Sequence, residues 1–220
     1  MIRYFGSAIV LLVAALLAGG CLQKEAVHTI YLSPDGAVRW TVDESGVVSD
    51  DTDPAKRLLE EQTYISNAVS GTHVAAQAFR AMAAEGLVRT SIVREERPYH
   101  VITDAQFSSI DSALSRFFKE AGLKASVTMK NVEGRTSVRA KLDFSKEPQD
   151  RGSPVLKMLE DLDDLRFVLT EGTFIAGGGF DVPDRMNARL SRTWMAAAEK
   201  AMEERREIEL VLTWDPNGTD

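Results

Sequence analysis

The residues with the clearest chemistry stand at the start of the chain. Arg3 is followed by an apolar run, roughly Tyr4 to Ala18, and then by Gly19, Gly20 and the only cysteine of the sequence, Cys21. A thiol can be alkylated with a diacylglyceryl group, and small residues before a cut let a peptidase thread an extended backbone through its site. The run is shorter than the about 20 residues that a helix needs to cross a bilayer. The pattern therefore predicts an export signal that is cleaved before Cys21.

The segment Leu17-Ala18-Gly19-Gly20-Cys21 resembles the lipobox of bacterial lipoproteins. The resemblance implies that residues 1–20 are a cleaved lipoprotein signal peptide and that acyl chains, palmitate among them, attach to Cys21. Such chains hold a mature protein in a membrane of the cell envelope. Ala18 departs from the usual pattern, in which Leu, Val or Ile is commoner three residues before the cysteine. The alternative is an ordinary secretory cleavage site that Cys21 merely follows.

The residue after the cysteine is Leu22. In lipoproteins that resemble those of enteric bacteria, Asp at this position retains the product on the inner membrane. Leu22 therefore favours the periplasmic face of the outer membrane, with the inner membrane as the alternative. A strand pattern begins near Val27, so residues 21–26 are expected to form a short lipidated tether of at most about 20 Å. We expect the folded domain to lie against the membrane surface.

The mature chain is acidic, which bears on its partners. The whole sequence has 26 Lys and Arg against 33 Asp and Glu, and without Arg3 the formal charge of the remainder is −8. Nucleic acid is not an expected partner, because phosphate neutralisation needs a basic surface. With Cys21 modified, no disulfide can form, so packing alone must hold the domain together.

Two acidic groups were considered as metal ligands. Asp50, Asp51 and Asp53 precede Pro54, but the spacing of an EF-hand is missing, and Asp53 is better interpreted as a helix cap with Pro54 in the first position. The group of Asp161, Asp163 and Asp164 is interpreted as the solvated side of a short helix. The sequence therefore predicts no metal site.

Two further motifs suggest catalysis or phosphate binding only at first sight. His73 stands beside Ser70 and Thr72 without a nucleophile elbow or an identifiable orienting acid, so we expect a capping or surface role. The run 177–179 is Gly-Gly-Gly, but no GK[ST] or G-x-G-x-x-G pattern follows, so we interpret it as a glycine-relieved strand end or bulge. No catalytic residue and no cofactor are predicted.

Apolar residues at periods of two and of about 3.6 predict hairpins separated by helices. The fold class is α+β, with a mainly antiparallel curved sheet built from hairpins and helices packed on one face. A single domain is expected over residues 27–215, with 216–220 as a C-terminal tail. The expected strands are 27–33, 37–42, 87–94, 99–103, 123–130, 137–144, 166–170, 173–176 and 208–214. The expected helices are 54–86 (one kinked helix or two), 107–122, 155–162 and 183–206.

Four basic residues share the solvent face of the two clearest strands, namely Lys124, Lys130, Arg139 and Lys141. They suit contact with anionic lipid headgroups. The alternative is a plain solvated sheet face on which Lys discourages edge pairing.

Function follows from the export signal and from the missing catalytic motifs. The first prediction is a membrane-anchored, non-enzymatic module for interaction or structure in the envelope, with a protein partner. The alternative is a protein that binds a lipid or another hydrophobic ligand at the membrane surface, which requires an apolar cavity of about 300 Å³ or more. The aromatic residues proposed to line such a cavity are Phe107, Phe117, Phe118, Phe167, Phe174 and Trp194.

Overall fold

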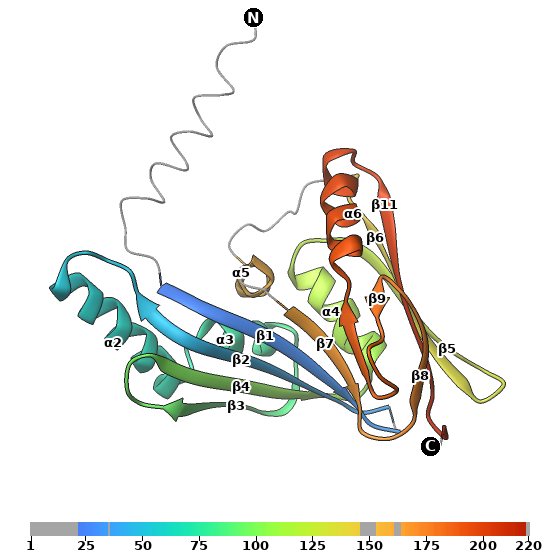
Figure 1. The fold of residues 1–220 in the computed structure, drawn as a ribbon, viewed down its shortest axis with the longest axis horizontal. Helices are drawn as coiled ribbons and strands as arrows, with labels where there is room; N and C mark the ends of the chain where they lie inside the picture. The colour runs from blue at the N-terminus through green and yellow to red at the C-terminus, as the bar shows by residue number, and fades with distance from the viewer. Residues whose placement is uncertain (1–21, 35, 146–152, 161–163, 219–220) are drawn as a thin grey trace, which may run out of the picture.

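A computed structural model describes residues 22–34, 36–145, 153–160 and 164–218 and has α+β architecture (Figure 1). The predicted export signal and the residues Cys21, Asp161 and Asp163 lie outside the described residues. The strands are β1 (Leu22–Leu32), β2 (Val38–Ser49), β3 (Glu85–Arg94), β4 (Tyr99–Phe107), β5 (Lys124–Val132), β6 (Arg135–Asp143), β7 (Asp164–Leu169), β8 (Thr173–Gly178), β9 (Phe180–Asp181), β10 (Asn187–Leu190) and β11 (Glu207–Asp215). The helices are α2 (Pro54–Ser70), α3 (Val74–Ala81), α4 (Ile110–Glu120), α5 (Pro154–Glu160) and α6 (Arg192–Glu203).

The strands divide between two sheets, where the sequence had suggested one. The larger sheet has the order β3-β4-β2-β1-β7-β10-β9, and the smaller has the order β5-β6-β11-β8. Pairing is antiparallel except between β1 and β7. After β4 the chain passes repeatedly between the sheets, since β5, β6, β8 and β11 lie in the smaller sheet and β7, β9 and β10 lie in the larger one (Figure 1).

The first hairpin follows from local sequence. Gly36 has φ +85° and its N–H donates to the Ser33 carbonyl at 2.9 Å, which closes the predicted turn. In β1 and β2 alternate side chains are buried, among them Ile30 and Trp40. The first strand begins at Leu22, so most of the expected tether is part of β1.

The segment 54–86 forms two helices. Asp53 caps α2, because its side chain accepts from the Ala55 N–H at 2.9 Å and Pro54 follows, as predicted. The helix ends at Gly71, which has φ +72°. His73 occupies the N-cap position of α3, although its side chain makes no capping hydrogen bond.

Two predictions for the last third of the chain are wrong. Segments 166–170 and 173–176 do not pair as a hairpin, because β7 lies in the larger sheet and β8 in the smaller one. The last helix does not begin at Pro183. The Asp184 carboxylate accepts from the backbone N–H groups of Met186 and Asn187, and this turn leads into β10 instead. The helix begins only after Ser191, whose Oγ accepts from the Trp194 N–H.

The main core lies between the two sheets and includes α3 and α4. Trp40 lies at its centre, with ring centroids of Phe79, Phe107 and Phe117 at 5.9, 6.3 and 5.2 Å. A smaller cluster under α2 contains Val47, Tyr64, Ala68 and Val101.

Candidate ligand cavity

The space between the two sheets is not completely filled. It contains a cavity of about 320 Å³, which lies in the size range of small-molecule sites. The lining residues are His28, Trp40, Leu114, Phe117, Phe118, Leu123, Val138, Ala140, Leu142, Phe144, Met158, Leu165, Phe167, Phe180, Leu190, Trp194, Met195, Ala198, Glu199, Met202, Leu210 and Leu212.

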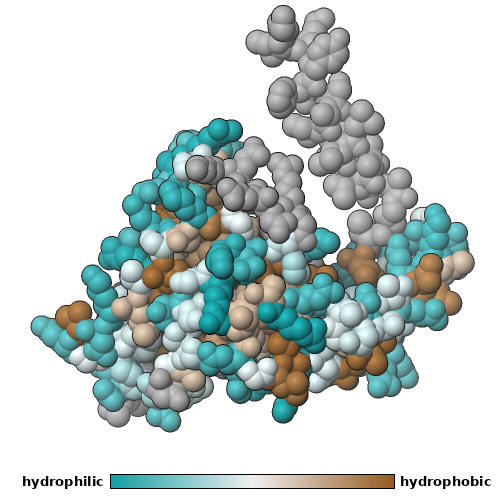
Figure 2. Space-filling model, turned by 180° about the vertical axis from the view of Figure 1, so that it is seen from behind, coloured by the Kyte–Doolittle hydropathy of each residue, from teal (hydrophilic) through white to brown (hydrophobic). Residues whose placement is uncertain are grey.

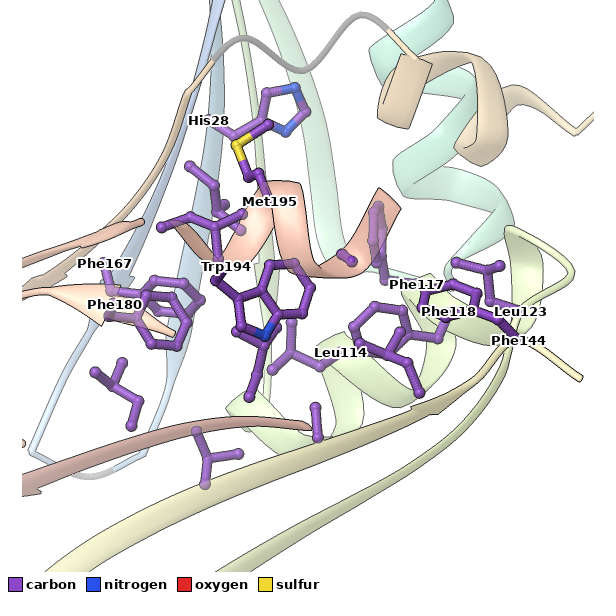
Figure 3. Close-up of a pocket in the computed structure, with 18 of the residues that line it drawn as sticks. His28, Leu114, Phe117, Phe118, Leu123, Phe144, Phe167, Phe180, Trp194 and Met195 are labelled. Carbon is purple, nitrogen blue, oxygen red and sulfur yellow. The ribbon is translucent and has the colours of Figure 1, made fainter. Parts of the chain in front are cut away.

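Aromatic and aliphatic side chains from both sheets and both flanking helices face this space (Figure 3). Phe117 and Phe118 approach from α4, and Trp194 approaches from α6 (Figure 3). Phe167 and Phe180 meet edge to face with ring centroids 5.2 Å apart. The wall is therefore a nearly continuous apolar surface that suits a hydrocarbon ligand.

Polar groups are scarce in the lining. His28 and Glu199 are the polar members among the described residues that line the cavity. The indole N–H of Trp40 donates to Nδ1 of His28 at 3.3 Å, so these two buried groups satisfy each other.

The two helices that flank the cavity differ in burial. In α4 five residues are buried, among them Leu114, Phe117 and Phe118, whereas in α6 only Ala198 and Ala201 are buried. The lining residues that are exposed to solvent are Met195, Glu199 and Met202, all from α6. In the described part of the chain, the cavity therefore opens beside α6.

The position of α6 depends on Trp194 and a glycine. The Trp194 Nε1–H donates to the Glu209 carbonyl of β11 at 2.9 Å. Gly179, between β8 and β9, has φ +97°, and a β-carbon on it would lie 2.6 Å from Cδ1 of Trp194. The glycine run thus ends a strand, as interpreted from the sequence, and its last member also makes room for the indole.

The aromatic prediction is confirmed in part. Phe117, Phe118, Phe167 and Trp194 line the cavity, whereas Phe107 and Phe174 belong to the buried core elsewhere. The sequence reasoning missed other lining residues, including His28, Trp40, Phe180, Met195 and Met202. The apolar alternation of β11 and the apolar stripe of α6 were visible signals for these walls, but such patterns do not separate a cavity wall from a filled core.

A second cluster of functional-group side chains is buried near the start of β1. Glu44 Oε2 accepts from the Tyr64 hydroxyl at 3.0 Å and lies 2.8 Å from His73 Nε2, while Oε1 pairs with Lys24 Nζ at 2.5 Å. Burial by itself raises the pKa of Glu44. The hydrogen bonds and charges of His73 and Lys24 outweigh this effect and lower the pKa to about 2. The surface role considered for His73 is wrong, because its side chain is 3% exposed. The Ser70 hydroxyl lies 2.8 Å from Thr72 Oγ1 and is not paired with His73.

The acidic groups considered as metal ligands have other partners. Asp51 Oδ1 accepts from the Asp53 N–H at 2.7 Å, within the turn before α2. Asp164 is not on a solvated helix face: it is buried at the start of β7, and its carboxylate pairs with Arg166 and Arg189 at 2.6 Å each. Within residues 22–34, 36–145, 153–160 and 164–218, no group of three or more His, Cys, Asp or Glu side chains is arranged to hold a metal ion.

The basic residues of β5 and β6 are mostly paired with acids. Lys124 binds Asp143, Arg139 lies 3.2 Å from Glu209, and Lys141 lies 2.5 Å from Glu207. The pKa of Lys124 and of Lys141 is raised, chiefly by the hydrogen bond to Asp143 and to Glu207 respectively. These pairs neutralise much of the charge that the sequence had suggested for contact with anionic headgroups.

Hydrophobic residues are scattered over the face of the molecule that Figure 2 shows. Figure 2 shows several separate brown areas among hydrophilic residues on the face seen from behind. The most exposed large apolar residues include Val69 at 75% and Leu87 at 71%.

No helix among the described residues is long and apolar enough to span a bilayer.

No protein-family model matches the chain, and no curated protein matches it significantly. Among solved structures, the folded domain of LppM from Mycobacterium tuberculosis is similar at a TM-score of 0.36 and 11% sequence identity. The likeness covers 92% of this chain and 93% of that chain. A TM-score and an identity this low support no inference about shared function.

Proposed function

We propose that this protein is an exported lipoprotein that binds a hydrophobic ligand, such as an acyl chain of a lipid, in the cavity between its two sheets. The observation that carries the proposal is the cavity of about 320 Å³, lined by apolar side chains except for His28 and Glu199. Of the two roles expected from the sequence, the cavity favours ligand binding over a purely structural module.

The physical argument for binding is the transfer of hydrocarbon out of water. Burial of each CH₂ group contributes about 0.8 kcal/mol, so a chain of eight buried methylenes contributes roughly 6 kcal/mol before ordering costs. The lining offers no charged partner deep in the cavity, because Glu199 lies on the exposed face of α6. A ligand with an apolar tail and an external polar group fits this distribution best.

The membrane anchor is part of the same proposal and rests on the sequence around Cys21. Acyl chains on this cysteine hold the protein at the envelope membrane, with the outer membrane favoured by Leu22. In a Cys21→Ser variant we expect the protein to leave the membrane fraction. An unchanged membrane fraction in that variant contradicts the anchor.

Tryptophan quenching tests the ligand site directly. Trp40 and Trp194 line the cavity, whereas Trp214 does not. A fatty acid brominated along its chain, bound in the cavity, should quench much of the fluorescence of the Cys21→Ser protein. Quenching should fall in Trp194→Phe and persist in Trp214→Phe. Absence of quenching in the folded parent protein, together with a ligand-free mass after incubation with envelope lipids, contradicts the proposal.

A role in interaction with an envelope protein is the second candidate. Val69 and Leu87 are exposed on a groove of about 550 Å³ between the end of α2 and the edge strand β3. A photoreactive residue at position 87 should then cross-link to a defined protein in intact envelopes. The same residue at Met129, exposed on β5, serves as the control. Equal cross-linking at both positions contradicts a specific surface.

A further inference from the structure

We propose that one stripe of α6 docks on a lipid bilayer, so that an acyl chain passes from the membrane into the cavity beside this helix. The stripe consists of Met195, Glu199 and Met202 and is called the rim stripe. The inference deepens the proposed function and rests on it.

The first observation is the position of the rim stripe at the mouth of the cavity. Its residues are both lining and exposed, with Met195 at 37% and Met202 at 50% exposure. Their spacing of four and three residues places them on one face of α6. Methionine is unbranched and polarizable, so it covers irregular apolar surface and can move aside for a chain.

The second observation is the charge of α6 and of the three residues after it on an acidic chain. The helix itself, Arg192–Glu203, has two basic and two acidic residues and is neutral overall. The formal charge of the whole chain is −7. The segment from Arg192 to Arg206 instead has four basic residues and three acidic ones, a net charge of +1. The basic residues are Arg192, Lys200, Arg205 and Arg206, and the acidic residues are Glu199, Glu203 and Glu204. Glu204 lies 3.7 Å from Lys200 Nζ and 2.6 Å from Arg206 Nε, so part of this positive charge is neutralised. Arg192, three residues before Met195, suits contact with the phosphate groups of a headgroup surface.

The third observation is the distance from the anchor. Cys21 directly precedes Leu22, the first residue of β1, so no spacer separates the lipid attachment from the sheet. His28 is six residues further along this strand and lines the cavity, which places it about 20 Å from Leu22 at about 3.3 Å per residue. Met195 and His28 both line the cavity (Figure 3). In Figure 1 the start of β1 lies at about mid-height on the left, and α6 lies at the upper right. Because no spacer follows Cys21, the anchor keeps the folded domain, and with it the rim stripe, close to the bilayer.

A fluorophore that reports on its surroundings tests the docking in the full anchored protein. A nitrobenzoxadiazole group is attached to Glu203→Cys, which is exposed on α6 one turn beyond Glu199 and does not line the cavity. The control carries the same group on Val93→Cys, which is 55% exposed on β3 and lies outside the groove near Leu87. In vesicles of phosphatidylcholine and phosphatidylglycerol, we expect a blue shift and brighter emission for position 203 only. The same response at both positions, or none at 203, overturns the docking.

The rate of chain uptake supplies a second readout. The probe is a vesicle whose lipids have brominated acyl chains, and quenching of Trp194 follows their passage into the cavity. We expect the double variant Met195→Lys and Met202→Lys to slow quenching at least tenfold, and Val93→Lys to leave the rate unchanged. Uptake by the double variant at the parental rate overturns the docking alone. Absence of quenching by free brominated fatty acid in the parent protein overturns the proposed function instead.

Discussion

A β-carbon on Gly179 would lie 2.6 Å from Cδ1 of Trp194, so the indole of α6 occupies space that only a glycine leaves open. The contact links a loop between two strands of different sheets to the helix beside the cavity mouth. The fixed position of α6 thus depends on a residue that has no side chain.

Gly179→Ala should both strain the backbone and displace Trp194. The φ of +97° costs about 1–2 kcal/mol for a residue with a β-carbon, and the overlap adds about 1–3 kcal/mol. Gly36→Ala is the matched control, because Gly36 has φ +85° and a β-carbon there meets nothing within 4 Å. Thermal unfolding should show the larger loss for position 179. Equal losses at the two positions would mean that the Trp194 contact contributes nothing.

Glu44→Gln should destabilise the protein at neutral pH and flatten its response to acid. The pKa of Glu44 is lowered from 4.5 to about 2 on folding, which corresponds to about 3 kcal/mol. Because the folded value is the lower one, this contribution is complete above about pH 5 and is lost as the pH falls from about 4.5 toward 2. Urea unfolding between pH 2 and pH 7 measures both effects.

The control for Glu44 is a more exposed pair of the same type. His100 Nε2 lies 2.7 Å from Asp43 Oδ1, with side chains 28% and 41% exposed. Exposed pairs contribute at most about 1 kcal/mol, so Asp43→Asn should have a small effect. If Asp43→Asn costs as much as Glu44→Gln, burial of the Glu44 cluster is not the source of its stability.

Ala198→Phe should reduce the capacity of the cavity. Ala198 is buried on α6 and lines the cavity, so an added ring occupies space that a ligand needs. We expect at least tenfold weaker binding of a brominated fatty acid, measured by titration of tryptophan quenching. Ala197→Phe adds the same group on the same helix outside the lining and is the control. Unchanged affinity in Ala198→Phe would contradict the cavity as the ligand site.

Removal of the paired basic side chains of β5 and β6 should not alter binding to anionic vesicles. Lys124, Arg139 and Lys141 each have an acidic partner on a neighbouring strand. The triple alanine variant of the Cys21→Ser protein should therefore match its parent in vesicle sedimentation. The reciprocal variant, with Asp143→Asn, Glu207→Gln and Glu209→Gln, should bind anionic vesicles more strongly. A clear loss in the alanine variant would restore the headgroup role for this face.

Local chemistry explains which parts of the fold could be predicted from the sequence. The Asp53 cap and the Gly36 turn depend on neighbouring residues and were correctly predicted. The helix expected from Pro183 was wrong because Met186 and Leu190 fit an apolar stripe, while Ala188 pairs with Phe167 of a distant strand. Such pairing over long separations leaves little trace in local periodicity.

The residues that line the cavity could also be predicted only in part from the sequence. Aromatic residues at strand or helix spacing were proposed as its lining, and Phe117 lines it whereas Phe107 does not. Both residues are buried, and their rings pack against the same Trp40. Whether a buried ring borders empty space depends on how the sheets and α6 are placed relative to each other, which no single segment determines.

The order of strands within the two sheets has a consequence for folding. Val27 of β1 pairs with Asp164 of β7, and β6 pairs with β11. The larger sheet therefore stays incomplete until β10 has been made, and the smaller sheet until β11 has been made. We expect slow folding, because closing such long loops costs entropy before the contacts form. We expect unfolding to occur as one cooperative transition, because strands of the two sheets alternate along the chain after β4. Leu210 and Leu212 of β11 line the cavity, so its walls come together only when this last strand has paired.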